Sequence, residues 1–334
     1  MTQLLEIRDR IKDFYARNDA FIVPIAKFVT ALIVLLVLNN NMGYMTKINN
    51  IAIVLIVSLS CSFLPMGAIV FFGAMFSLLH MYALSLEVLI IGFAIYLCVF
   101  LLVGRFHFKD SIVLAVVPVL CAMKLTCVIP IVIGLLATPA ACFSAACGVV
   151  IHYYIQVVKT NSSVISSMSD EGITEKVKLL LDGLIQNKSM VFMAAAVAIA
   201  IVAVYMIKRL SVDYAWTIAM VVGVMVTLII LLVGDIIYDT NVSLFGAVVS
   251  AVVAIAVGKV IEFFRFCVDF SRTEKLQFED DEYYYYVKAI PKMNVPASNK
   301  SVKNISRPSQ MQMSPTRSMI IDGTEGNLDD TRQF

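Results

Sequence analysis

The segment SIVLAVVPVLCAMKLTCVIP, residues 111–130, is apolar over about the length that a helix needs to cross a bilayer. Pro118, Pro130 and Lys124 interrupt it. A proline inside a helix leaves a backbone carbonyl without its partner, and at membrane depth that carbonyl must be satisfied by protein or by water in a cavity. These residues are typical of a broken or re-entrant segment, which enters and leaves the membrane on the same side.

The chain on both sides of this segment is strongly apolar. Of its 334 residues, 60% are hydrophobic and 15% are charged, and the mean hydropathy is +0.87. Soluble domains have about 45–50% apolar and about 25% charged residues, so an ordinary soluble enzyme is excluded. Nine apolar runs follow one another: 21–38, 51–64, 66–84, 87–104, 111–129, 131–158, 190–207, 215–233 and 243–264. This succession is typical of a polytopic membrane protein.

The charged connections limit the number of crossings. Residues 208–214 contain Lys208 and Arg209, and basic residues also occur within 105–110, directly after the last run and before the first. Basic connections favour the cytoplasmic side, which also places the N-terminus there. The connection 234–242 has only acidic charges and is expected outside.

Nine complete crossings cannot satisfy all these positions, whereas eight can. One run between 111 and 158 must then enter and leave on the same side. We expect 111–130 to do so, and the alternative is that 131–158 forms two short passes hinged at Thr138-Pro139. Both solutions give the same sidedness downstream.

The predicted fold is an all-α polytopic transmembrane bundle of about eight spans plus one re-entrant or broken segment, with a small cytoplasmic C-terminal tail. In the segment FEDDEYYYYVKAIPK (278–292), the tyrosine run favours either a short strand or a hairpin in which 275–278 pairs with 283–287. The expected order is an amphipathic helix (1–20), a first transmembrane block (21–158), a polar loop with an amphipathic helix (159–189), a second transmembrane block (190–265), a short structured tail (266–295) and a disordered end (296–334).

Ionisable residues inside a membrane are candidates for function, because an unpaired charge there is costly. Lys124 is the main candidate. It could line a polar pathway together with Pro118, Pro130 and Pro139, or its amine could reach the membrane surface along its aliphatic chain.

Two further groups of residues suggest contacts rather than chemistry. Small residues at four-residue intervals in the last run allow close helix packing, either within the chain or between copies: Gly246, Ser250, Ala254 and Gly258. The tyrosine run could bind a protein partner or pack against the chain's own bundle: Tyr283, Tyr284, Tyr285 and Tyr286.

The sequence contains no nucleotide-binding loop, zinc-protease motif or hydrolase elbow, and its net charge of +2 gives no reason to expect nucleic-acid binding. We expect no enzymatic activity, no cofactor, no metal and no nucleic-acid partner. The expected partners are the lipid bilayer and a protein, or a second copy, that contacts the bundle faces and the tail.

Four segments carry a family resemblance: NNMGYMTKINNIAIVL (40–55), HMYALSLEV (80–88), RLSVDYAWTIA (209–219) and FEDDEYYYYVKAIPK (278–292). Over nearly its full length the chain resembles a family of uncharacterised multi-span integral membrane proteins of clostridial-type Gram-positive bacteria. The resemblance implies a bacterial plasma membrane and brings no activity or site residues with it.

The expected function is that of a non-enzymatic membrane component of a cell-envelope or transport assembly. The alternative is a permease or channel for a small polar or anionic solute that uses the broken region 111–139.

Overall fold

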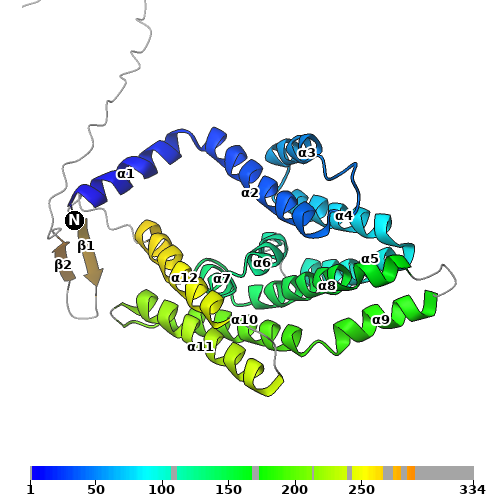
Figure 1. The fold of residues 1–334 in the computed structure, drawn as a ribbon. Helices are drawn as coiled ribbons and strands as arrows, with labels where there is room; N and C mark the ends of the chain where they lie inside the picture. Colours follow the sequence, from blue (N-terminus) through cyan, green and yellow to red (C-terminus); the bar gives the residue numbers. More distant parts are fainter. Residues whose placement is uncertain are drawn as a thin grey trace, which may run out of the picture. The chain divides into compact units, whose positions relative to one another are not determined.

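The computed structural model describes residues 2–106, 111–167, 173–212, 214–238, 243–265, 274–279 and 284–289. The chain divides into two units, 1–269 and 270–334. The first unit is helical (Figure 1): α1 (Thr2–Arg17), α2 (Asp19–Met42), α3 (Ile51–Phe63), α4 (Gly67–Leu84), α5 (Leu86–Phe106), α6 (Ile112–Ala122), α7 (Val128–Leu136), α8 (Ala141–Ser167), α9 (Ile173–Ile185), α10 (Lys188–Ile207), α11 (Ala215–Tyr238) and α12 (Leu244–Arg265).

Seven of the described helices are long and apolar enough to cross a membrane: α2, α4, α5, α8, α10, α11 and α12. Their outer faces carry large exposed apolar side chains, among them Ile33, Phe93, Phe100 and Ile229. Apolar helices with apolar outer faces are suited to contact with a lipid bilayer. The expected all-α polytopic bundle is therefore confirmed.

Helix α3 has only 13 residues, about 20 Å, and is short for a hydrocarbon core of about 30 Å. Together with the loop before it, α3 nevertheless returns along α2 from Asn39 to Pro24. At one end the Ser62 hydroxyl donates to the Pro24 carbonyl at 2.8 Å. At the other end the Asn39 amide donates to the Ile48 carbonyl at 3.1 Å, in the loop that precedes α3. The loop and α3 together retrace α2.

Helices α6 and α7 form a hairpin that re-enters the bundle. Helix α6 runs parallel to α8, because Val117 lies against Gly148 and Ala122 shares a cavity with Lys159. Helix α10 is antiparallel to α8, because its first residues lie beside the C-terminal half of α8. The C-terminal carbonyls of α7 bind Lys208 at the end of α10, so α7 runs opposite to α6 and α8. The turn of the hairpin lies at residues 123–127.

The hairpin differs in extent from both sequence-based solutions. It occupies 112–136 rather than 111–130, so the predicted re-entrant run was too short. The alternative places a break correctly at Thr138-Pro139, between α7 and α8, but α8 is then one helix of 27 residues instead of a short pass. In the apolar sequence from Ile131 onward only Thr138-Pro139 marks this boundary, since no charged residue occurs there.

Helix α8 is the central element of the bundle. It packs against α2, α4, α5, α6, α7, α9 and α10, and Figure 1 shows it in the middle of the helices. Its buried share, 56%, is the largest among the seven long apolar helices. Tyr154 on this helix is fully buried and donates to the Val88 carbonyl at 2.8 Å.

Helix α9 caps the bundle through a buried ion pair. Lys176 on α9 lies 3.6 Å from Glu87 at the start of α5, and the two side chains are 4% and 13% exposed. Leu180, one turn further on, is fully buried. These contacts place the amphipathic helix of the polar loop against the bundle.

Helix α1 matches the expected N-terminal amphipathic helix. Ile7, Ile11 and Phe14 are exposed apolar residues on it, as an interfacial helix requires. The buried Arg8 lies over the ring of Phe263 near the end of α12, at 5.8 Å. This contact places α1 beside the C-terminal end of α12.

The second unit contains an antiparallel hairpin of β1 (Glu274–Glu279) and β2 (Tyr284–Ala289). Glu274 pairs with Ala289 and Glu279 with Tyr284, so the ladder is slightly longer than the hairpin that the sequence indicated. The end of the chain expected to be disordered, 296–334, lies outside the described residues.

Candidate functional site

Helix α7 is a half-helix whose first backbone N–H groups all have partners. The Cys127 N–H donates to the Ser250 hydroxyl of α12 at 2.9 Å. The next two N–H groups, of Val128 and Ile129, donate to carbonyls in the preceding turn. The fourth residue of this turn is Pro130, which has no N–H. Pro130 therefore fits the start of α7 without loss, and it is buried there.

The C-terminal end of α7 is capped by a lysine from another helix. The Lys208 amine, just after α10, donates to the carbonyls of Gly134 at 2.8 Å and Leu135 at 3.0 Å. A cation at this end also interacts favourably with the helix dipole. Burial lowers the pKa of Lys208, and repulsion from Arg265 and Arg209 lowers it further. Neither cap was recognised from the sequence, because Lys208 and Ser250 are distant from α7 along the chain.

Lys124 lies at the turn of the hairpin and is exposed. Its φ of 59° is left-handed. The Lys124 N–H donates to the Cys121 carbonyl and the Leu125 N–H to the Leu120 carbonyl, which together make a Schellman motif at the end of α6. Lys124 thus occupies the position that glycine usually holds.

The four candidate pathway residues do not gather in one cavity. Pro118 is buried in α6, Pro130 is buried at the start of α7, and Pro139 is exposed between α7 and α8. Of the four, only Pro118 borders a cavity in the described part of the chain: one of about 20 Å³ between α2, α6 and α8, and one of about 30 Å³ that α4 and α5 also line. Each has room for one or two waters. Lys124 borders neither of them.

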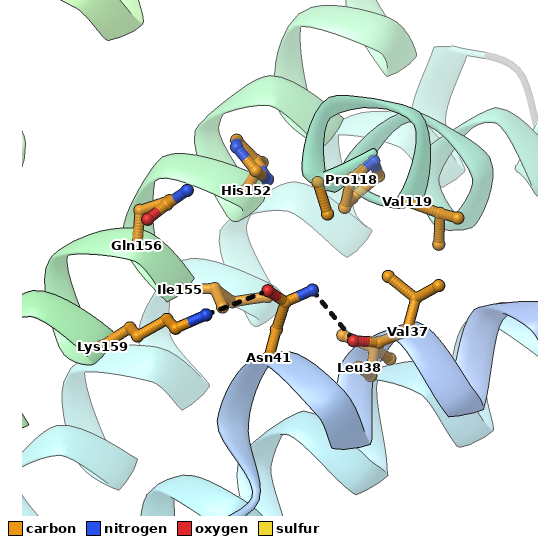
Figure 2. A pocket seen from close by; sticks show the side chains of 10 residues that line it. Val37, Leu38, Asn41, Pro118, Val119, His152, Ile155, Gln156 and Lys159 are labelled. Carbon is orange, nitrogen blue, oxygen red and sulfur yellow. Dashed lines mark hydrogen bonds between the residues drawn. The ribbon is translucent and has the colours of Figure 1, made fainter. Parts of the chain in front are cut away.

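The first of these cavities has a polar side. Figure 2 shows Lys159 of α8 reaching toward α2, where its amine donates to the Asn41 amide oxygen at 3.3 Å. The Asn41 amide donates in turn to the Val37 carbonyl at 2.9 Å. The side chain of His152, also on α8, lies beside Pro118.

A larger polar groove lies on the neighbouring face of α8, and we call it the α8 groove. Its volume is about 360 Å³. It lies between α8, the last turn of α9 and the start of α10, and His152 and Gln156 border both this groove and the small cavity of Figure 2. Nine residues line it: His152, Tyr153, Gln156, Val157, Thr160, Asn161, Gly183, Asn187 and Ser189.

The α8 groove was not recognised from the sequence, although a signal exists. His152, Gln156 and Thr160 recur at intervals of four residues on one helix face. Aromatic residues at the end of a span, such as His152-Tyr153-Tyr154, are also typical of an interfacial belt, and this conceals the polar signal.

A second buried polar cluster joins the ends of α2 and α4. The His80 imidazole accepts from the Met45 N–H at 3.1 Å through Nδ1, so Nε2 carries the proton and donates to the Asn39 amide oxygen at 2.8 Å. Both His80 and Asn39 are buried. Since each group has a partner within the chain, this cluster fixes the loop before α3.

The small-residue face of α12 packs inside the chain. Ser250 and Ala254 are fully buried, and a Cβ added at Gly258 would collide with Met220 of α11 and crowd Ile131 of α7. Gly246 is half-buried and contacts only its own helix start. The contact left open by the sequence is, for three of these four residues, an internal one.

Of the candidate partner-binding tyrosines, Tyr284, Tyr285 and Tyr286 lie in β2, opposite Glu279, Phe278 and Gln277 of β1. Tyr283 lies outside the described residues.

Comparison of the chain with protein-family models, with curated proteins and with solved structures finds no match.

Proposed function

We propose that the protein is a non-enzymatic integral component of a cell-envelope or transport assembly in a bacterial plasma membrane, with both termini in the cytoplasm. The observation that carries this proposal is the β-hairpin of the second unit. In the part of the chain that the structure describes, its sheet has two strands only. An isolated two-stranded hairpin is marginally stable in water, and a third strand would stabilise it.

A partner protein can supply that strand. An extended segment that pairs with the free edge of β1 or β2 adds backbone hydrogen bonds, and the side chains of the edge strand select the sequence that binds. The tyrosine-rich β2 favours such pairing, because aromatic residues form good cross-strand pairs. The acidic residues near the turn disfavour anionic lipid as the alternative occupant.

The bundle itself supports the same proposal. The small-residue face of α12 is largely used inside the chain, and the remaining outer faces are apolar and suited to lipid. We therefore expect a protein partner to bind the tail rather than the faces of the bundle.

The test is photo-crosslinking of the full-length protein in native membranes, with the photoreactive residue at Gln277. The expected result is an adduct with a second protein that disappears when β2 is broken by Tyr285→Pro. The matched control is Ser301→Pro, outside the hairpin, which should leave the adduct intact. The proposal is wrong if no adduct forms or if Tyr285→Pro does not affect it. An adduct of twice the chain mass would identify the partner as a second copy.

The α6–α7 hairpin favours a second candidate, a permease or channel for a small polar or anionic solute. Broken helices whose ends lie inside the bundle form the substrate sites of many transporters. The test is solute or ion flux through proteoliposomes that contain the purified protein. A flux that falls at least tenfold in Lys124→Met supports a pathway past the hairpin, and an unchanged flux excludes this lysine from it.

A further inference from the structure

The α8 groove has the size and the chemistry of a binding site for a small molecule. Its volume of about 360 Å³ lies at the lower end of the range for small-molecule pockets, about 300–1,000 Å³. By comparison, the two cavities that border Pro118 hold one or two waters each. The α8 groove is thus the only one of these three spaces that admits a solute.

The groove is lined by uncharged hydrogen-bonding groups. Amide side chains come from Gln156 and Asn161 of α8 and from Asn187 before α10, and hydroxyl groups come from Thr160 and Ser189. None of its nine lining residues is a carboxylate, a lysine or an arginine. Amides and hydroxyls both donate and accept, so they match a ligand that does the same and carries no charge.

Several of these groups have no partner within the described part of the chain. The side chains of Gln156, Thr160 and Ser189 form no hydrogen bond there, and the Asn161 amide uses one donor on the Val157 carbonyl and keeps its oxygen free. Because Gln156 and Thr160 are exposed, their hydrogen-bonding groups are open to solvent or to a ligand. A ligand with several hydroxyl groups would satisfy them together.

An aromatic surface borders the same groove. The rings of His152 and Tyr153 meet edge to face, with centroids 5.5 Å apart and an interplanar angle of 86°. Rings of this kind offer apolar area to the C–H faces of a ligand. The combination of aromatic surface, amides and hydroxyls is suited to a sugar ring.

The groove lies on the least apolar of the long helices. This helix is the least apolar and the most buried of the seven long apolar helices. In a membrane bundle, polar residues face the interior or a water-filled space rather than lipid. Here the polar residues concentrate toward its C-terminal half, where the groove lies.

We propose that the α8 groove binds an uncharged, multiply hydroxylated group of the size of one or two sugar rings. This group can be a free saccharide or the head group of a glycolipid, since both present the same hydroxyls. The proposal rests on α8 and its neighbours in the first unit, and it is independent of the partner proposed for the tail.

The test is calorimetric binding to the full-length protein in nanodiscs. The probes are N-acetylglucosamine, maltose and, in a separate set of nanodiscs, diglucosyl diacylglycerol. We expect saturable binding of at least one probe. Binding of the free sugars indicates a soluble ligand, and binding of the glycolipid alone indicates a lipid head group. Glucose 6-phosphate, which carries charge, should bind at least tenfold more weakly than the best uncharged probe.

Two variants locate the site. Gln156→Leu and Thr160→Val remove hydrogen-bonding groups at exposed positions, so both should fold, and each should raise the Kd of the probe at least tenfold. Ser163→Ala is the matched control on the same helix, because Ser163 is exposed and does not line the groove. Unchanged elution and thermal unfolding will show that the variants are intact. Absence of binding by every probe at 10 mM, or binding that both variants leave unchanged, would overturn the proposal.

Discussion

Lys124 holds a backbone conformation that non-glycine residues adopt at a cost. In the left-handed region the Cβ crowds the following carbonyl, which costs roughly 1–2 kcal/mol. The Schellman motif at the end of α6 imposes this conformation, and the packing of Leu120 and Leu125 on the same apolar cluster supports it. The structure of this turn therefore depends on the backbone conformation of Lys124 more than on its charge.

Lys124→Gly should stabilise the protein. The relief of crowding exceeds the entropy that glycine loses on folding, so the free energy of unfolding should rise by about 0.5–1 kcal/mol. Unfolding in detergent micelles measures the change. Lys124→Ala is the control, since it removes the charge and keeps the Cβ, and it should give no gain. Equal stabilisation by both variants would show that the charge, and not the backbone, is the source of the cost.

Lys208 should make stability depend on alkaline pH. Its pKa in the folded state is lowered from 10.5, chiefly by burial and then by Arg265 and Arg209. Between the lowered value and 10.5 the unfolded state binds more protons than the folded state, so the free energy of unfolding rises with pH. The neutral amine keeps two N–H groups for the carbonyls of Gly134 and Leu135.

Comparison with Lys208→Met separates this effect from other titrations. The difference in unfolding free energy, wild type minus variant, should increase as the pH rises toward 10.5. A difference that stays flat or falls would mean that the two carbonyls stabilise the charged amine enough to cancel its burial.

At the scale of elements, α9 is held to the bundle by the Lys176–Glu87 pair and Leu180. Removal of Lys176 leaves the Glu87 carboxylate without its cation, and because Glu87 is partly exposed the cost is below the value of about 3–5 kcal/mol typical of a fully buried pair. Lys176→Met should therefore release α9, and hydrogen exchange of residues 173–185 should lose its protection. Lys178→Met, at an exposed position of the same helix, should leave the exchange unchanged. Protection that persists in Lys176→Met would show that apolar packing alone holds α9.

The ends of helices could be predicted where the sequence changes from apolar to polar. They could not be predicted where an apolar run continues across the boundary. The long spans such as α10 and α11 are bounded by charged connections, and the sequence places them within a few residues. The division between α7 and α8 falls inside an apolar run, marked only by Thr138-Pro139. The capping of α7 by Ser250 and Lys208, and the meeting of α8 with Asn187 in the groove, depend on contacts distant along the chain. Periodicity and composition carry no information about such contacts.

At the scale of the bundle, contacts collect several basic residues at one end. Lys208 binds the last carbonyls of α7, and Arg265 and Arg209 lie close enough to repel its charge. Arg8 lies over the ring of Phe263 near the end of α12. This is the end at which the α6–α7 hairpin enters and leaves. The opposite end also has lysines, but α9 contains acidic residues as well, and Lys176 forms an ion pair with Glu87 of α5. By the positive-inside rule this distribution favours the cytoplasmic location that we propose for the first end.

This arrangement predicts which sites a membrane-impermeant maleimide reaches in intact cells. A cysteine at Ser162, near the end of α8, should be labelled from outside. A cysteine at Thr138, in the exposed turn after α7, should be labelled only after the cells are opened, because the hairpin returns that turn to the side from which α6 entered. The wild-type chain, with its own cysteines, gives the background. Labelling of Thr138→Cys from outside would mean that α6 and α7 together cross the membrane, and it would reverse the sidedness of every helix from α8 to α12.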